Sequence, residues 1–103
     1  MKKLGKNQNM SDLGGTPVTV ALNSSTTVKI LDANPDRVGY ELTNNSSHDV
    51  WIKRQAASVD NIVTGNAYVF KRSFYESPTD YIYTGEVSAI AVSGSPSVTV
   101  SEI

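Results

Sequence analysis

A chain of 103 residues is long enough for one domain and too short for two. Its net charge of −1 argues against binding of nucleic acid or of an anionic membrane by the molecule as a whole. The chain has no cysteine, which excludes disulfides and thiolate chemistry and favours folding in a reducing cytoplasm.

The first 16 residues are rich in Lys, Asn, Gln, Ser and Gly and show no apolar periodicity. They lack the apolar stretch of a secretory leader. Without apolar periodicity, residues 1–16 are expected to be either a disordered terminus or an extended arm on a glycine hinge. Residues 1–16 carry a charge of +2, whereas residues 17–103 carry six basic and nine acidic side chains, a balance of −3. We therefore expect an arm that docks on an acidic surface, such as that of a neighbouring copy. Its expected contacts are Lys2, Lys3, Lys6 and Leu13.

From Pro17 onward, apolar and polar side chains alternate with a period of two, which predicts half-buried strands. The strands expected in the first half of this region are 18–22, 26–32, 37–43 and 48–54. Turns rich in Asn, Ser, Pro and Asp separate them. In the third and fourth strands the side chains expected to face the core are Val38, Tyr40, Leu42, Val50 and Ile52. Trp51 and Lys53 are expected to face outward.

The second half begins with an irregular stretch, 55–67, which predicts a long surface loop with a helical turn near 56–58. The strands expected after it are 68–76, 80–83, 86–93 and 98–101. Phe70 and Phe74 are expected on one face of the first of these. Apolar residues occupy both faces of 86–93, which predicts that this strand is covered on both sides.

These elements predict an all-β fold, a single antiparallel β-sandwich or small barrel of about eight short strands over residues 17–103. The extended arm over residues 1–16 precedes it. Strands 37–43 and 48–54 are expected to pair as a hairpin, and so are the last two strands.

The sequence offers few groups for chemistry. His48 is the only histidine, and its neighbours Ser46, Ser47 and Asp49 cannot easily converge on it, because adjacent strand residues point to opposite faces. One histidine and no cysteine argue against zinc, and the acidic residues lack the spacing of a calcium loop. We predict no catalytic residues, no cofactor and no metal site, and hence no enzyme.

Aromatic residues are the remaining candidates for binding. Trp51 faces outward by alternation, and Tyr81 and Tyr83 are expected near it, as is Tyr75. Trp51 either caps one end of the core, anchors a protein interface or forms a platform for a sugar. Lys53, Arg54, Lys71 and Arg72 are expected to be solvated strand charges, because no basic surplus supports a nucleic-acid track.

Several segments together resemble a known class of proteins. They are, in order, Val18-Thr-Val-Ala-Leu22, Lys29-Ile-Leu-Asp-Ala-Asn-Pro-Asp-Arg37, Glu41-Leu-Thr-Asn-Asn-Ser46, Asp49-Val-Trp-Ile-Lys53, Tyr83-Thr-Gly-Glu-Val-Ser-Ala-Ile-Ala91 and the Val-Thr-Val-Ser-Glu end. Over residues 17–103 this resembles the small β-sandwich virion proteins of tailed bacteriophages, of the capsid decoration (cement) or head-fibre type. The loop with Gly65 departs from the glycine-rich turn of such modules.

The resemblance implies a non-enzymatic structural protein of the virion, assembled in the host cytoplasm. Its implied partner is the major capsid protein or another virion protein, which it binds and stabilises as a homo-oligomer on the particle. The alternative is a tail or head-fibre module that recognises a host glycan or protein. In either case the arm is expected to add a strand to an open sheet edge of a neighbour.

Overall fold

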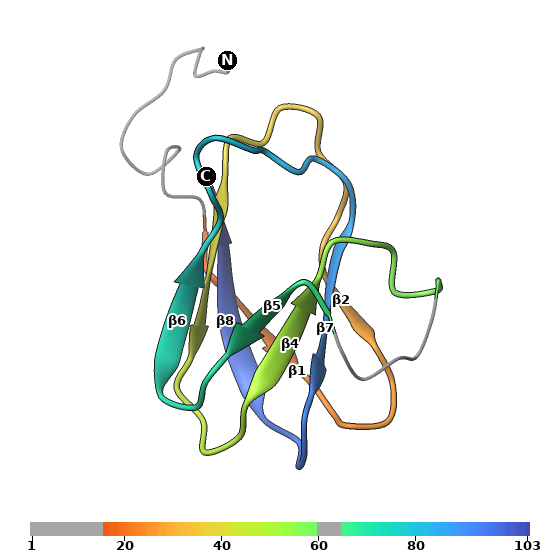
Figure 1. The fold of residues 1–103 in the computed structure, drawn as a ribbon, viewed down its shortest axis with the longest axis vertical. Coiled ribbons are helices and arrows are strands. Elements are labelled where there is room, and N and C mark those ends of the chain that lie inside the picture. The colour runs from red at the N-terminus through yellow and green to blue at the C-terminus, as the bar shows by residue number, and fades with distance from the viewer. Residues whose placement is uncertain (1–15, 60–64) are drawn as a thin grey trace.

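The computed structural model describes residues 16–59 and 65–103, which form eight strands and no helix (Figure 1). The strands are β1 Val18–Ala21, β2 Val28–Leu31, β3 Tyr40–Asn44, β4 Val50–Lys53, β5 Ala67–Val69, β6 Ser73–Glu76, β7 Val87–Ala91 and β8 Ser97–Glu102. They make two antiparallel four-stranded sheets that pack face to face. The predicted β-sandwich is confirmed.

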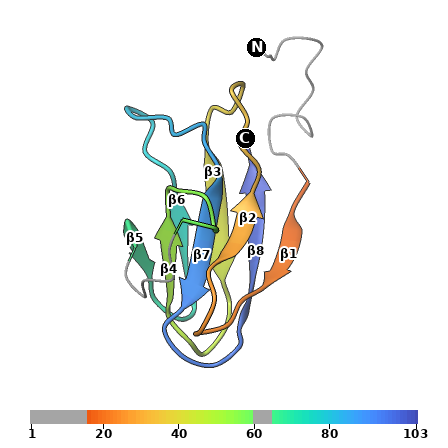
Figure 2. The ribbon, with the colours of Figure 1, turned by 90° about the vertical axis from the view of Figure 1, so that its right-hand side faces the viewer.

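One sheet has the strand order β1-β8-β3-β6 and is called here the β8 sheet, and the other has the order β2-β7-β4-β5 and is called the β7 sheet. Figure 2 shows β1 and β5 at opposite sides of the sandwich. Among the described strands, only β4 and β5 follow each other in the chain and also lie in the same sheet. Every other connection crosses from one sheet to the other. This is the strand order of a jelly roll.

Both hairpin predictions are wrong. β3 and β4 lie in different sheets, and so do β7 and β8. β3 pairs with β6 and β8, while β7 pairs with β2 and β4. A short polar turn and two alternating strands describe a hairpin and a crossing between sheets equally well, because alternation records which face is buried and not which strand lies alongside.

The predicted strand 68–76 is in fact two strands. Arg72 has a φ of 60°, and its N–H donates to the Ser46 carbonyl at 3.2 Å. This turn carries the chain from β5 in the β7 sheet to β6 in the β8 sheet, so Phe70 and Phe74 do not share a strand face. Residues 80–83 are also not a strand but part of the long β6–β7 connection.

The core lies between the inner faces of the two sheets. Tyr40, Leu42, Val50 and Ile52 are buried there as predicted, whereas Val38 precedes β3 and is 57% exposed. All five residues of β7 are buried, which confirms that this strand is covered on both sides.

The outer face of the β7 sheet is partly covered by the loop that follows β4. Ser88 Oγ on β7 donates to the Gln55 carbonyl at 3.0 Å, and Ala57 N–H donates to Glu86 at 2.8 Å. Lys53 is correspondingly buried, and its Nζ donates to Thr27 Oγ1 at 3.0 Å. The prediction that Lys53 is a solvated charge is therefore wrong, because strand alternation cannot show that a later loop folds over the outer face.

Arg37 joins three segments at the end of the sandwich where the chain enters β3. Its buried guanidinium forms an ion pair with Glu102 at 2.7 Å and donates to the carbonyls of Tyr83 at 2.8 Å and Gly85 at 2.9 Å. A further bond reaches the Asp32 carbonyl at 2.5 Å. A planar group with five donors can satisfy this many acceptors without water. Arg37 thereby fixes the β2–β3 turn, the β6–β7 connection and the C-terminal end of β8.

Replacing Arg37 by Ala should lower the free energy of unfolding by about 3–5 kcal/mol, because Glu102 and three carbonyls lose their buried partner. Urea denaturation measures the change. Lys71→Ala is the matched control, since that side chain is exposed, and its effect should stay within about 0.5 kcal/mol. Equal stabilities of the two variants would contradict the role assigned to Arg37.

Tyr40 is a buried residue with a distinct dependence on pH. Desolvation, followed by the influence of Tyr75, raises the pKa of the Tyr40 hydroxyl from 10.0 to about 12. Its contact with the Tyr75 side chain contributes to this shift but lacks the geometry of an ordinary hydrogen bond, and no other described residue is its partner. The folded state keeps the proton longer than the unfolded chain, so the contribution of Tyr40 is complete below pH 10.0 and is lost as the pH rises towards 12.

The variant Tyr40→Phe should therefore be at least as stable as the wild type at neutral pH, since no hydrogen bond is lost. It should also lose less stability than the wild type in alkali, because the titrating group is gone. Chemical denaturation at neutral pH and above pH 10 measures both effects. A marked loss of stability at neutral pH would show that the hydroxyl has a partner after all.

Candidate functional site

Three aromatic side chains lie together on the outer face of the β7 sheet. Val50 and Ile52 of β4 point into the core, so Trp51 between them points outward, directly opposite Tyr68 of β5. Phe70 is two residues beyond Tyr68 and lies beside it. Ring centroids are 4.8 Å apart for Trp51 and Tyr68 and 5.1 Å apart for Tyr68 and Phe70, both in edge-on arrangements. We call Trp51, Tyr68 and Phe70 the aromatic cluster.

The aromatic cluster is exposed although it is apolar. Tyr68 is 37% exposed and Phe70 is 64% exposed, while Trp51 is half-buried. Edge-to-face contacts of this kind stabilise the relative orientation of the rings by about 0.5–1.5 kcal/mol per pair. The cluster is therefore a preformed apolar surface.

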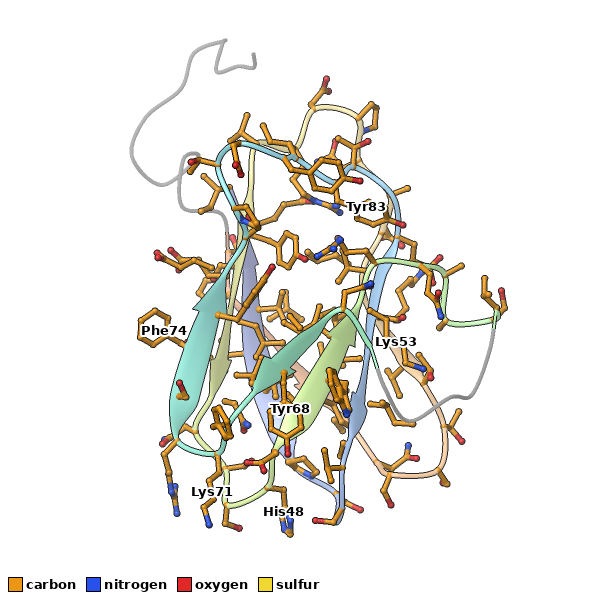
Figure 3. All side chains as sticks on the ribbon, viewed as in Figure 1. His48, Lys53, Tyr68, Lys71, Phe74 and Tyr83 are labelled. Carbon is orange, nitrogen blue, oxygen red and sulfur yellow. The ribbon has the colours of Figure 1, made fainter. Side chains whose placement is uncertain are left out.

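Asp49 holds one member of the cluster in place. Its Oδ2 accepts a hydrogen bond from the Tyr68 hydroxyl at 2.7 Å, and its Oδ1 accepts one from the Lys71 N–H at 2.7 Å. The Tyr68 hydroxyl, and then the Lys71 N–H, hold the pKa of Asp49 below its usual value of 3.8, and the same contact raises the pKa of Tyr68. Figure 3 shows Tyr68 above Lys71 and His48, near one end of the sandwich.

Phe70 is fixed through its backbone by Asn44, a fully buried residue at the end of β3. Asn44 Nδ2 donates to the carbonyls of Phe70 at 3.2 Å and His48 at 2.8 Å, and its Oδ1 accepts from Ser46 Oγ at 2.6 Å. One buried amide therefore joins the β3–β4 turn to the β5–β6 turn. Nothing in the local sequence of 44–46 signals this contact with a residue 26 positions away.

His48 lies at the same end, and its ring contacts residues that are far from it in sequence. Its Nδ1 is 3.1 Å from Ser93 Oγ, and its ring fills the space beside Gly94, whose φ of 71° suits glycine. Both carboxylate oxygens of Asp49 are bonded to Tyr68 and Lys71. Among residues 16–59 and 65–103, therefore, His48, a serine and a carboxylate do not form a hydrogen-bonded relay.

The structure brings Trp51 together with Tyr68 and Phe70 rather than with the tyrosines expected beside it. Tyr83 packs against the core at the opposite end of the molecule from His48 (Figure 3). Tyr81, on the same β6–β7 connection, is 57% exposed and lies beside Arg54, with the guanidinium carbon 5.8 Å from the ring centroid. The arm residues Lys2, Lys3, Lys6 and Leu13 lie outside the described residues, so their predicted role stays a prediction.

Sequence reasoning identified the outward direction of Trp51 but missed its partners. Tyr68 and Phe70 belong to the cluster because β5 pairs with β4 in a register that sets Tyr68 opposite Trp51. The signal available in the sequence was the Tyr-x-Phe spacing of 68–70, which places both rings on one strand face. Only the strand pairing shows which other rings share that face.

Within residues 16–59 and 65–103, no group of three or more His, Asp or Glu side chains is arranged to hold a metal ion. The same residues contain no helix of the length and apolar character that a membrane span requires. Scans of protein-family models, of curated proteins and of solved structures each returned no match to this chain. The resemblance to phage virion proteins stays a prediction.

The Asp49–Tyr68 contact can be checked by NMR titration of the Asp49 carboxyl group. Its midpoint should lie below 3.8 in the wild type and rise in Tyr68→Phe, because the first of its two donors is removed. Since the folded-state pKa is lowered, this contact stabilises the fold above pH 3.8 and is lost as the pH falls through the folded-state value. An unchanged midpoint in Tyr68→Phe would contradict the hydrogen bond.

Proposed function

We propose that this protein is a non-enzymatic component of a bacteriophage virion, a capsid decoration (cement) protein that attaches to the major capsid lattice in many copies. The observation that carries the proposal is the exposed aromatic cluster of Trp51, Tyr68 and Phe70. Tryptophan and tyrosine are enriched at the positions that contribute most to protein–protein binding. A partner that covers these rings removes apolar surface from water.

The way the cluster is held also favours a role in attachment. Asp49 anchors Tyr68 and Asn44 anchors the Phe70 backbone, so few side-chain and loop rotations are lost when a partner binds. The jelly-roll sandwich behind it is a rigid platform, and this architecture occurs in viral capsid and lectin domains. Because one fold carries many functions, the choice of a capsid partner depends on the sequence resemblance.

The first test is whether the protein occurs on particles. Mass spectrometry of heads and tails separated from phage lysates of cells that carry the gene should find the protein on heads, in many copies. Its absence from purified particles would refute the proposal, and its presence on tails alone would refute the capsid role.

The second test addresses the surface. Particles that lack the protein are mixed with purified protein, and binding is followed by sedimentation. Phe70→Ser should weaken attachment on the order of 10-fold to 100-fold, because the most exposed ring of the aromatic cluster is lost. Val38→Ser is the matched control, since Val38 is a comparably exposed apolar side chain (57% against 64% for Phe70) at the opposite end of the sandwich, and it should bind like the wild type. Equal binding of both variants would exclude the aromatic cluster as the attachment surface.

A second candidate is a fibre module that binds a host glycan, and one observation favours it. Each Asp49 carboxylate oxygen accepts one hydrogen bond and has a further lone pair, and one of these oxygens is bonded to the Tyr68 hydroxyl. A hydrogen-bond acceptor therefore stands at the hydroxyl end of an exposed aromatic ring. A sugar presents both an apolar face and hydroxyl donors. This candidate uses the same cluster for a different ligand.

A glycan array probed with the purified protein tests this candidate. Binding that is lost in Asp49→Asn and Trp51→Ala but kept in Val38→Ser would support a glycan site. If the protein binds no glycan at millimolar concentration but attaches normally to particles, the glycan candidate is excluded and the capsid role is the one that remains.

A further inference from the structure

No described strand pairs with the outer edge of β6. β6 pairs with β3 on one side only, and it forms one edge of the β8 sheet. Ser77 N–H donates to the Tyr40 carbonyl at 2.9 Å, which sets Leu42–Tyr75 and Asn44–Ser73 as the hydrogen-bonded pairs of this antiparallel ladder. The N–H and C=O groups of Phe74 and Glu76 therefore point away from β3. None of the described residues pairs with them.

The side chains on this edge are apolar and acidic. Phe74 is 67% exposed on the outer face of the β8 sheet, and Glu76 is exposed on the same face two residues later. Glu41 of β3 lies directly opposite Glu76, so two carboxylates share one position of the sheet. Neither forms an ion pair with any described residue, and like charges placed directly opposite each other are destabilising. The position favours a cationic partner.

The other three sheet edges differ in charge. β1 carries no ionisable side chain, and Lys29 of β2 is already paired with Asp32 at 2.6 Å. β5 carries Tyr68, whose hydroxyl is bonded to Asp49. Among the described strands, β6 is thus the edge where open backbone groups, an exposed ring and unpaired carboxylates coincide.

The sequence of the N-terminal arm matches this edge. Lys2, Leu4 and Lys6 are spaced two residues apart, so in an extended strand all three share one face. With Leu4 beside Phe74, an antiparallel strand puts Lys2 beside Glu76, and a parallel strand puts Lys6 there. Either direction places an apolar side chain on the ring and a lysine on the carboxylates.

We propose that residues 2–6 of a second copy of this chain add as a fifth strand to the open edge of β6. Strand addition satisfies the free backbone groups of Phe74 and Glu76, and the one lysine that lies beside Glu76 offsets part of the charge of Glu41 and Glu76. An arm from the same copy would have to cross the outer face from β1, at the other edge of the sheet, past β8 and β3. A neighbouring arm avoids that path. Each copy then offers one arm and one edge, which links copies head to tail.

This contact does not involve the aromatic cluster, so it goes beyond attachment to a capsid and can fail or hold independently of it. It requires that the purified protein self-associate in the absence of particles. It also requires that association weaken as salt is added, because the carboxylates and lysines are exposed and screened.

Charge reversal on each side provides the test, with sedimentation velocity as the readout. The edge variant Glu41→Lys/Glu76→Lys and the arm variant Lys2→Glu/Lys6→Glu should each raise the dissociation constant at least about tenfold, since like charges then face each other. Mixed in equal amounts, the two variants should associate again, because each arm now meets an edge of opposite charge. The matched controls Lys3→Glu, on the other face of the arm, and Asp36→Lys, in the β2–β3 turn, should associate like the wild type.

Three results would overturn the proposal. A wild-type protein that stays monomeric at millimolar concentration excludes the contact. If the edge variant associates as well as the wild type, the β6 edge is not part of the contact. If the arm variant does so, residues 2–6 are not part of it. Two variants that fail alone and also fail when mixed exclude exchange between copies. Attachment to particles, measured separately with Phe70→Ser, is unaffected by any of these outcomes.

Discussion

The burial of one apolar face of each sheet against the other is the constraint on which the rest of this structure depends. Consecutive strands rarely lie side by side, because nearly all connections in the described part of the chain cross from one sheet to the other. The contacts that hold the sandwich together are therefore made between residues far apart in sequence, and the short strands have little stability of their own. β7, with all five residues buried, is the strand in which this constraint is most severe.

Buried polar groups fix the two ends of the sandwich, where the apolar core cannot. At one end the Arg37 guanidinium joins the β2–β3 turn, the β6–β7 connection and Glu102. At the other end the Asn44 amide joins the turns before β4 and before β6. Each group satisfies several backbone acceptors away from water, so each specifies loop positions that apolar packing alone would leave undefined.

The sandwich presents two surfaces that differ in chemistry. The aromatic cluster lies on the outer face of the β7 sheet and is apolar, and Asp49 at its margin is hydrogen-bonded to Tyr68. The edge of β6 belongs to the β8 sheet and combines free backbone groups with Phe74, Glu41 and Glu76. An apolar face suits a broad partner surface, whereas an open edge suits an extended segment. The two proposed contacts use different surfaces, so neither one blocks the other.

The sequence by itself determined that the chain is all-β, that Tyr40, Leu42, Val50 and Ile52 point inward, that Trp51 points outward and that β7 is covered on both sides. These are consequences of local alternation, since each strand residue faces the side opposite to that of its neighbours. Tertiary structure alone decided which strands are neighbours. With that it decided the break at Arg72, the burial of Lys53 and the joining of Trp51 to Tyr68 and Phe70. It also set Glu41 of β3 opposite Glu76 of β6. Alternation assigns a residue to a face, but the residues it meets there are set by pairing and packing between distant segments.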